Sequence, residues 1–321
     1  MKFVVGLLLL SYSTLLLSAN IRLISTYDGL KRAIEEAHAF DTILIEDNAH
    51  IDFTGEDAIT ISKPLILKSE SIVSWFRPKF LNADKKTILI INAENVKIEN
   101  INFEGNQTDS KKAEILAYNK KHRTSKGVYQ YPVTKGIHVK GNGFSLKESE
   151  VSGFSHAGVF LEGAKNAIIE NVHFHHNQRW GLGYGIALHL AATATIKNGE
   201  FDYNRHSIAG SGSIGQSYEV SYSTFGDNHL ASPLDMHGGK DRADGTNIAG
   251  HSVYIHHNTI LEDDHYIFIH RGVAQNKVTI SHNKLMNTKK RSFVGYYNIN
   301  KESIPKSKFI FRSNQIVFSL F

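Results

Sequence analysis

Apolar and polar residues alternate through most of the chain in runs of three to six residues, which is the pattern of β-strands that bury one face. One segment has helical periodicity instead. Residues 28–38 place Leu30 and Ile34 on one side and charged residues on the other, which predicts an amphipathic helix with Asp28 as its N-cap. The chain is therefore expected to be built of short strands that follow a single N-terminal helix.

The strand pattern repeats from residue 88 onward. A short strand, a turn, a second strand and an Asn- or Gly-rich turn recur at a base spacing of about 23–25 residues, with insertions. This spacing is typical of stacked coils, in which each coil buries its apolar positions against the next one. The second strand of the unit aligns eight times, over residues 98–103, 146–151, 169–174, 196–201, 220–225, 255–260, 280–285 and 311–316.

The repeat, together with a helix followed by the segment DTILIEDNAHIDF (41–53), resembles the right-handed parallel β-helices of the pectate-lyase-like superfamily. The resemblance implies an all-β fold, a single-stranded right-handed parallel β-helix (a solenoid) with an N-terminal capping helix. It covers most of the chain from residue 21, and we expect residues 20–321 to form one domain and a monomer. The same fold carries lyases, hydrolases, epimerases and adhesins, so it does not by itself define an activity.

Residues 1–19 have the features of a secretory signal peptide. Lys2 provides a positive charge, residues 3–17 are apolar, and Ala19 is a small residue at the expected cleavage point. The apolar run is shorter than the ~20 residues of a membrane-spanning helix, so an uncleaved anchor is the lesser alternative. We expect a secreted or periplasmic protein without stable membrane insertion after cleavage.

Composition narrows the chemistry further. The chain contains no cysteine, which excludes disulfides, thiolate metal sites and a cysteine nucleophile. The net charge of +5 suits an anionic partner, but no recurring Lys/Arg stripe interleaved with aromatic residues indicates nucleic acid. The basic and aromatic insertion at residues 104–135 is expected to be either a solvated loop or a wall beside a groove for an anionic polymer.

Alignment of the first strands of the coils places an unusual set of side chains on one outer face. Neighbouring coils lie ~4.8 Å apart, so outward residues of successive strands form a ladder. A solvated strand face usually carries Thr, Ser, Lys and Glu, whereas this ladder contains His, Asp and Arg separated by the small Ala187, Ser207 and Ala209, which predicts a groove for a chain-like ligand. The expected substrate-binding residues are His138, Lys140, Glu162, Tyr184 and His189, and the expected catalytic residues are Arg205, His206, Asp235, His237, His270 and Arg271.

The pair Asp235-x-His237, followed by Arg271, resembles the Asp-x-His pair of β-helical mannuronan C5-epimerases, although Met236 stands where those enzymes have proline. Removal of the C5 proton of a uronic acid places negative charge on the adjacent carboxylate. A guanidinium from Arg271 or Arg205 would stabilise that charge, and a neutral imidazole is a suitable base, for which His237 is the candidate.

The remaining roles follow from the same chemistry. Asp235 is expected to orient a neighbouring donor or to bind sugar hydroxyls. The second proton-transfer group would be His189, His206, His270 or Tyr184. A proton given to the glycosidic oxygen would make the protein a polysaccharide lyase, and a proton returned to C5 would make it an epimerase.

The expected function is thus a lyase for an acidic, uronate-containing polysaccharide, with a C5-epimerase as the alternative. A glycoside hydrolase needs two carboxyl groups ~5–9.5 Å apart, and Asp235 and Glu162 are ~14 Å apart at three coils' distance. Hydrolysis and non-catalytic polysaccharide binding are the lesser alternatives.

No cofactor or metal is assigned. Asp241 and Asp244 in the second insertion could hold calcium, but two acids in a turn fall short of a calcium motif. Fifteen of the 18 histidines lie between His138 and His282. Those of the second-strand repeat are expected to be turn or stacking residues, with a three-histidine zinc site as the lesser alternative; they are His173, His175, His176, His256, His257 and His282.

Overall fold

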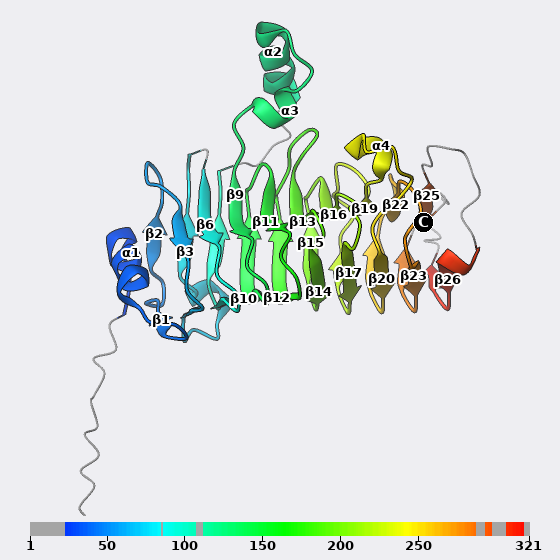
Figure 1. The fold of residues 1–321 in the computed structure, drawn as a ribbon. Helices are drawn as coiled ribbons and strands as arrows, with labels where there is room; N and C mark the ends of the chain where they lie inside the picture. The colour runs from blue at the N-terminus through cyan, green and yellow to red at the C-terminus, as the bar shows by residue number, and fades with distance from the viewer. Residues whose placement is uncertain (1–22, 85, 107–111, 287–292, 297–305, 318–321) are drawn as a thin grey trace, which may run out of the picture.

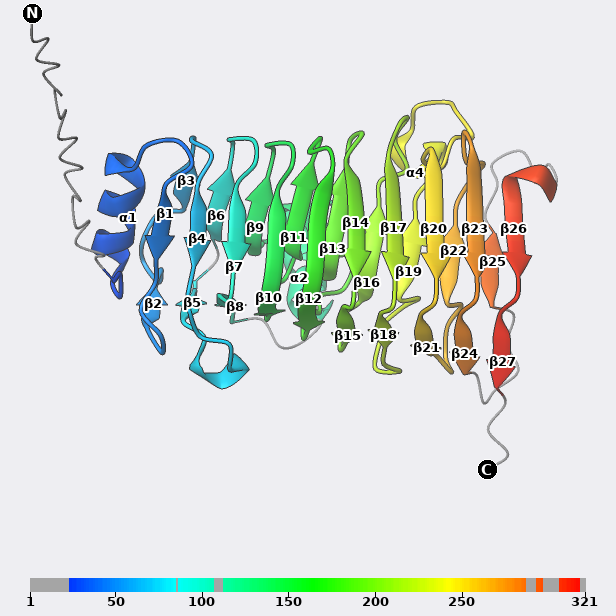
Figure 2. The ribbon, with the colours of Figure 1, turned by 90° about the horizontal axis from the view of Figure 1, so that it is seen from below.

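The computed structural model describes residues 23–84, 86–106, 112–286, 293–296 and 306–317, and the predicted signal peptide lies outside this range. Parallel strands stack along one axis into a solenoid, with a helix at the N-terminal end (Figures 1 and 2). The helices are α1 (Tyr27–Glu36), α2 (Lys112–His122), α3 (Gly127–Gln130) and α4 (Gly239–Arg242), with 3-10 turns η1 (Ser74–Phe76) and η2 (Lys306–Lys308). Among the described residues, no helix has both the length and the apolar character needed to cross a membrane.

The strands described here form two sheets that run along the solenoid. The first, sheet 1, consists of β3 (Ile59–Ile61), β6 (Thr87–Ile91), β9 (Lys135–Val139), β11 (Ala157–Glu162), β13 (Tyr184–His189), β16 (His206–Gly210), β19 (Leu234–Met236), β22 (Phe268–His270) and β25 (Val294–Tyr296). The second, sheet 2, consists of β1 (Thr42–Leu44), β2 (His50–Asp52), β4 (Ile66–Lys68), β5 (Lys79–Leu81), β7 (Lys97–Glu99), β8 (Asn102–Glu104), β10 (Ser145–Ser152), β12 (Ala167–His175), β14 (Thr193–Lys197), β15 (Glu200–Asp202), β17 (Ser217–Ser221), β18 (Thr224–Phe225), β20 (Ser252–His256), β21 (Thr259–Leu261), β23 (Lys277–Ser281), β24 (Lys284–Met286), β26 (Phe309–Arg312) and β27 (Gln315–Val317).

The strand register confirms the repeat alignment. Ile169 pairs with Leu146 on one side and Ile196 on the other, as the aligned units require. The same correspondence continues through Val220 and beyond, to the pairing of β23 with β26. Because side chains alternate between the two faces of a strand, correct pairing puts every apolar set of the repeat on the same inner side.

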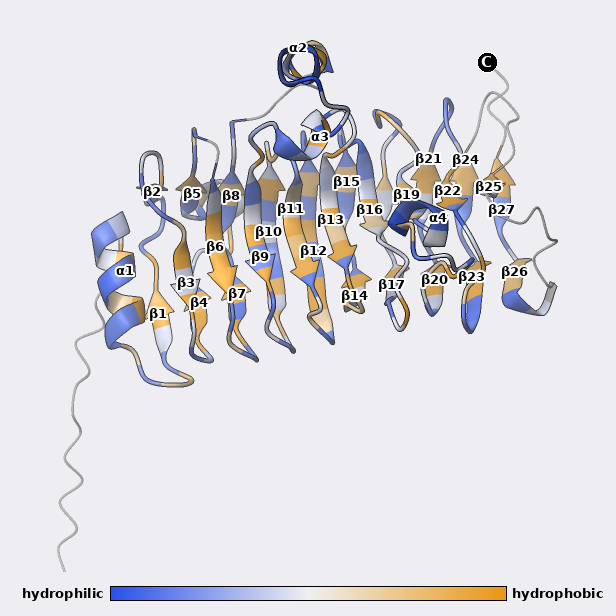
Figure 3. Cartoon of the chain, turned by 45° about the horizontal axis from the view of Figure 1, so that its top comes forward, coloured by the Kyte–Doolittle hydropathy of each residue, from blue (hydrophilic) through white to orange (hydrophobic). Residues whose placement is uncertain are grey.

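Stacked aromatic and aliphatic side chains fill the core of the solenoid. Phe174, Phe201 and Phe225 come from three successive coils, and their rings stack with centroids 5.3 and 4.8 Å apart. All three are almost completely buried. Such ring pairs add ~0.5–1.5 kcal/mol each beyond the burial of their area. Figure 3 shows most of the hydrophobic colour along the strands, whereas α2 and α4 are mainly hydrophilic.

Helix α1 closes the N-terminal end of the core with Leu30 and Ile34, both buried. The predicted N-cap at Asp28 is wrong: Thr26 is the cap, and its hydroxyl accepts a hydrogen bond from the Gly29 amide at 3.1 Å. Asp28 lies in the first turn instead, where a carboxylate is favourable next to the positive end of the helix dipole. The helix covers a sheet edge that would otherwise present unpaired backbone groups.

Buried asparagines hold the turns of successive coils together. The Asn283 side chain donates to Ile255 O at 2.9 Å and to Asn314 Oδ1 at 2.9 Å. Its own Oδ1 accepts from the backbone and side-chain nitrogens of Asn258, at 2.9 and 3.0 Å. Each side chain therefore satisfies backbone groups of neighbouring coils that water cannot reach.

Replacing Asn283 by alanine is expected to lower the free energy of unfolding by about 3 kcal/mol, because it leaves buried groups of Asn258 and Ile255 without partners. Urea unfolding followed by circular dichroism measures the loss. Asn276→Ala is the matched control, since Asn276 bonds Ser252 at the exposed surface and should change stability by less than about 0.5 kcal/mol. Equal effects of the two substitutions would contradict this role of the buried ladder.

Two insertions leave the solenoid next to sheet 1. The basic insertion at residues 104–135 contains α2 and α3 and stands above β9 and its neighbours (Figure 1). Arg179 anchors it: the completely buried guanidinium donates to the backbone oxygens of Val128, Tyr131 and Pro132 at 2.9–3.2 Å. The second insertion begins with α4, which follows β19.

Candidate active site

A hollow of about 510 Å³ lies on the outer face of sheet 1, between the two insertions. Its floor includes the small residues Ala187 and Ala209, which leave room above the strands, as the sequence predicted. α3 contributes Tyr129 to one side, and α4 contributes Asp241 and Arg242 to the other. The other lining residues are His156, Phe160, Leu182, Tyr184, Leu188, His189, Leu190, Gly210, Ser211, Ser213 and His237.

A charged cluster centred on Asp235 borders this hollow. The Arg271 guanidinium binds the Asp235 carboxylate through two bonds, Nε to Oδ1 at 2.9 Å and Nη2 to Oδ2 at 2.6 Å. His237 Nε2 and His206 Nε2 lie 3.3 and 3.4 Å from Asp235 Oδ2. The second imidazole nitrogen of His237, Nδ1, lies 3.0 Å from Asp241 Oδ2. His237 is therefore held between two carboxylates, and Asp235 between Arg271 and two imidazoles.

This arrangement changes the protonation expected of His237. Burial alone would lower the pKa of His237, but the contacts with Asp235 and Asp241 outweigh it and raise the pKa to about 9. Burial would raise the pKa of Asp235, yet its contacts with His237, His206 and Arg271 hold that pKa far below its usual range. A pKa of about 9 favours the protonated form of His237 near neutral pH, which argues against the role of a neutral base that the sequence suggested.

The free energy of unfolding is expected to fall by up to about 3 kcal/mol between pH ~6.5 and ~9, relative to a His237→Gln variant. The folded pKa of His237, about 9, lies above the ordinary histidine value, so its contribution is complete below pH ~6.5 and is lost as pH rises through ~9. Urea unfolding of both proteins across this range measures the difference. The contributions of the other titrating groups are common to both proteins and cancel in it. Parallel pH profiles would contradict the ion-pair assignment.

Asp235 is completely buried beneath its partners. It therefore has no surface with which to bind sugar hydroxyls, and that part of the sequence interpretation is wrong. Its orienting role has a direct basis, because the 3.3 Å contact to His237 and the paired bonds to Arg271 set the positions of both cations.

His270 does not lie on the outer face. Ile267 and Phe268 are both buried, and their amides both donate to Phe293 O. The alternation of inward and outward side chains in β22 is therefore shifted by one residue from the one that the sequence pattern indicates. Met236 pairs with His270, and Asp235 pairs with Ile269. The His270 ring therefore points inward, stacks on Phe268 and donates through Nε2 to Ala249 O at 3.1 Å. The prediction of His270 as a proton-transfer residue is wrong for this reason.

Three other predicted residues, Tyr184, Arg205 and His206, lie at the hollow or next to it. The Arg205 guanidinium lies 3.5 Å from Tyr184 Oη, and burial raises the pKa of Tyr184, so its hydroxyl carries a proton at neutral pH. His206 stacks on Tyr184 from below and is buried, with Nδ1 bonded to Ser232 O. Burial lowers the pKa of His206 to about 3. Of these residues, Tyr184 lines the hollow, Arg205 supports its hydroxyl, and His206 is covered.

The other predicted binding residues lie on β9, β11 and β13. His138 Nε2 lies 2.9 Å from Glu162 Oε2, and Lys140 Nζ lies 3.9 Å from the same oxygen. Glu162 pairs with His189 in the register of sheet 1. His189 is exposed, lines the hollow and stacks its ring on Phe160, with centroids 5.8 Å apart. The structure thus brings all of these residues together along one face.

His156, Tyr129 and Asp241 are among the lining residues that the sequence did not assign to the site. His156 lies in a turn before β11, and burial together with Lys135 and Arg179 lowers its pKa to about 3, so it is a neutral imidazole. Tyr129 and Asp241 come from the insertions, whose positions no repeat specifies. Asp241 contacts His237, whereas Asp244 bonds Arg242 and Thr246, so these two carboxylates do not form the shared calcium site considered from the sequence.

A buried serine, histidine and glutamate also form a chain beneath the site. Ser207 Oγ lies 2.7 Å from His229 Nε2, and His229 Nδ1 lies 3.8 Å from Glu262 Oε2. The set has the composition of a nucleophilic triad. Ser207 is fully buried, however, so no polymer can reach its hydroxyl, and the chain links the turns of neighbouring coils.

The stacked parallel coils, with a groove across one sheet, define a right-handed parallel β-helix protein. A family model described as "Right handed beta helix region" matches residues 135–316, which is more than half of the chain, and the protein therefore belongs to that family. No match is found among curated proteins.

Solved structures share the fold at low sequence identity. The alginate lyase from Paenibacillus sp. str. FPU-7 is 16% identical, with a TM-score of 0.57 over 92% of this chain and 94% of that one. ORF18 of Geobacillus virus E2 is 9% identical, with a TM-score of 0.54 over 90% of this chain and 58% of that one. Pectate lyase Pel9A is 12% identical, with a TM-score of 0.48 over 90% of this chain and 71% of that one. At such identities the likeness to the first two structures, whose TM-scores exceed 0.5, shows the shared fold alone.

Proposed function

We propose that the protein is a polysaccharide lyase that acts on an acidic, uronate-containing polymer through abstraction of the C5 proton. The observation that carries the proposal is the hollow over Ala187 and Ala209, which has His237, paired with two carboxylates, on one side and the candidate proton-transfer groups His189 and Tyr184 on the other. The structural likeness to an alginate lyase agrees with this chemistry.

The positive side of the hollow suits the uronate carboxylate. His237 and His189 are two strands apart in sheet 1, which corresponds to ~10 Å and is enough for one sugar ring between them. Both N–H groups of the His237 imidazolium face Asp235 and Asp241, so its positive charge, and not a free N–H, would stabilise the charge that develops on the uronate carboxylate when the C5 proton leaves. Arg271 and Asp241 would keep the imidazolium in place from behind.

The opposite side supplies the proton transfers. His189 is our candidate for the base that takes the C5 proton, since its exposed imidazole lines the hollow. Tyr184, whose hydroxyl is protonated and lies beside Arg205, would give a proton to the glycosidic oxygen as the bond to it breaks. The weakly basic His156 would hydrogen-bond the sugar from the wall.

Hydrolysis fits the hollow less well. The two-carboxylate mechanism needs a pair of accessible acids, but among the described lining residues Asp241 is the one carboxylate, and it is paired with His237. Asp235 is buried behind it.

The test is an assay with polymannuronate, polyguluronate, polygalacturonate and glucuronate-containing polymers. A lyase produces an unsaturated uronate that absorbs in the ultraviolet, and Tyr184→Phe should abolish this signal while the protein remains folded. C5 exchange in heavy water without new absorbance would instead establish the epimerase. New reducing ends without either signal would indicate hydrolysis and overturn the proposal, as would inactivity on all polymers.

We further propose export of the protein, supported by the apolar segment at residues 1–19.

A further inference from the structure

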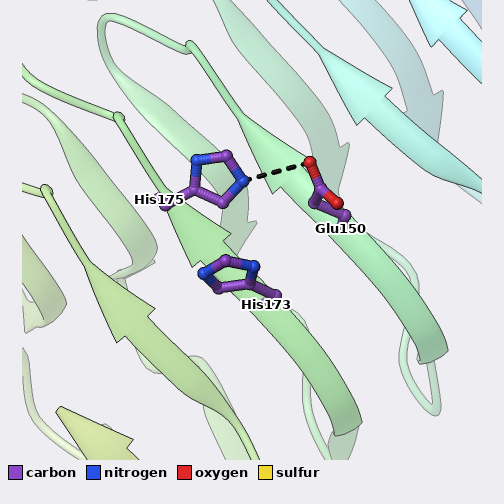
Figure 4. A group of neighbouring side chains, drawn as sticks. All are labelled: Glu150, His173 and His175. Carbon is purple, nitrogen blue, oxygen red and sulfur yellow. Dashed lines mark hydrogen bonds and ion pairs between the residues drawn. The ribbon is translucent and has the colours of Figure 1, made fainter. Parts of the chain in front are cut away.

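Two histidines and a glutamate converge on the outer face of sheet 2, away from the hollow on sheet 1. His173 and His175 project from the same side of β12, with ring centroids 4.3 Å apart, and Glu150 projects from the neighbouring β10 (Figure 4). One ligand atom of each residue lies within 4.8 Å of those of the other two. Glu150 Oε1 is already 3.1 Å from His175 Nε2.

The register explains why these side chains meet. Glu150 pairs directly with His173, and His175 follows two residues later on the same face. On the next strand, β15, Glu200 pairs with His173 and Asp202 pairs with His175. Two imidazoles thus lie on the middle strand of three, with carboxylates on both sides.

We propose that Glu150, His173 and His175 bind a divalent transition-metal ion, of which Zn²⁺ is the representative. Two imidazole nitrogens and one carboxylate oxygen are a donor set that zinc accepts, with a fourth position open to water or to another carboxylate. Ligand atoms around one tetrahedral zinc ion lie ~3.3 Å apart. The Glu150–His175 pair has this separation already, and a ring nitrogen of His173 lies within 4.8 Å of both of these ligand atoms.

Neighbouring side chains orient the His175 ring. His175 Nδ1 lies 2.7 Å from His176 Nδ1, which leaves Nε2 directed at Glu150 and available to the ion. The His176 ring is itself stacked on Tyr203, with centroids 4.6 Å apart and planes within 8°. Outer contacts of this kind fix the orientation of metal-binding histidines in proteins. A bound ion would connect β10 to β12 and so stabilise adjacent coils.

Sheet 2 also offers a matched control. His256 Nε2 lies 3.1 Å from Glu219 Oε1, and His256 Nδ1 lies 2.9 Å from His257 Nδ1, as in the pair His175–His176. Here, however, Tyr254 lies two residues before the histidine and opposite the glutamate, where the first cluster has His173. The control cluster lacks the third ligand.

The experiment is a titration of the metal-free protein with ZnCl₂ by calorimetry, together with melting curves in the presence and absence of zinc. We expect one saturable zinc ion and a rise in the melting temperature with zinc. His173→Ala and His173→Gln should each weaken binding at least ~100-fold, and His256→Ala should leave it unchanged.

The proposal would be overturned by the absence of saturable zinc binding, or by equal binding by the wild-type protein and both His173 variants. Loss of binding in His256→Ala to the same extent as in His173→Ala would also overturn it, since the ion would then bind elsewhere. Melting temperatures measured without zinc establish that the variants are folded.

Discussion

Substitution of His237 by glutamine is expected to lower kcat/KM on the cleaved polymer by about 10²–10³-fold, which is the usual effect of removing one group that stabilises developing charge. Glutamine keeps a hydrogen-bond donor near Asp235 and Asp241 but carries no charge. The loss should appear mainly in kcat, because the carboxylate gains electron density only as the C5 proton leaves.

Steady-state kinetics of the purified variant tests this expectation, with His251→Gln as the control for loss of a histidine at the exposed surface. Wild-type activity should also decline above pH ~9, where the pKa of about 9 predicts loss of the imidazolium proton. Activity of the glutamine variant within threefold of the wild type would remove His237 from the mechanism. An increase in activity through pH 9 would show that the neutral imidazole is the active form.

Substitution of Asp235 by asparagine is expected to lower the free energy of unfolding by about 3–5 kcal/mol, the usual consequence of breaking a buried ion pair from one side. The buried carboxylate neutralises Arg271 through two short bonds and contacts His237 as well. Without it, Arg271 keeps a charge that is largely removed from water, and the pKa of His237 falls toward its ordinary value because one of its two carboxylate partners is lost.

Urea unfolding at pH ~6 measures this effect, and Asp227→Asn is the control, because Asp227 is exposed on a turn of the same solenoid. The pKa of His237, followed by NMR of its ring protons, should drop in Asp235→Asn and stay unchanged in Asp227→Asn. A loss of less than about 1 kcal/mol would contradict the view that Asp235 is the centre of the cluster.

Stability and activity are thus coupled in one cluster. The same carboxylate that keeps Arg271 and His237 charged also removes itself from the substrate, because its oxygens are used by these partners. Under the proposed function, His237 would face the substrate, and Asp235 would act through it. Asp235 can therefore matter to the site although it does not line the hollow.

Much of the fold follows from the sequence alone, because a parallel solenoid is specified locally. Each coil pairs with its sequence neighbours, so the period of the apolar residues defines the register, and the second-strand units from residue 98 to residue 316 pair as aligned. The outward positions of Glu162, His189 and His237 follow from the same alternation. The groove floor at Ala187 and Ala209 could be predicted for this reason.

The sequence could not specify what departs from the repeat. Ile267 and Phe268 are adjacent apolar residues, and the sequence pattern allows either one to point inward. In the structure both are buried, and His270 turns inward as a result. The insertions have no period, so the helices α2 and α3 and the approach of Asp241 to His237 depend on contacts distant in sequence, such as those of Arg179.

Protonation was likewise decided by the tertiary structure. From the sequence, 18 histidines are chemically alike. In the folded chain, two carboxylates make His237 a cation, whereas burial keeps His156 and His206 neutral. A charge depends on the groups within a few ångströms and on access to water, and both are properties of the assembled coils. The sequence alone therefore determined the solenoid and the face that carries the site, and the tertiary structure decided which residues of that face meet and what charge they hold.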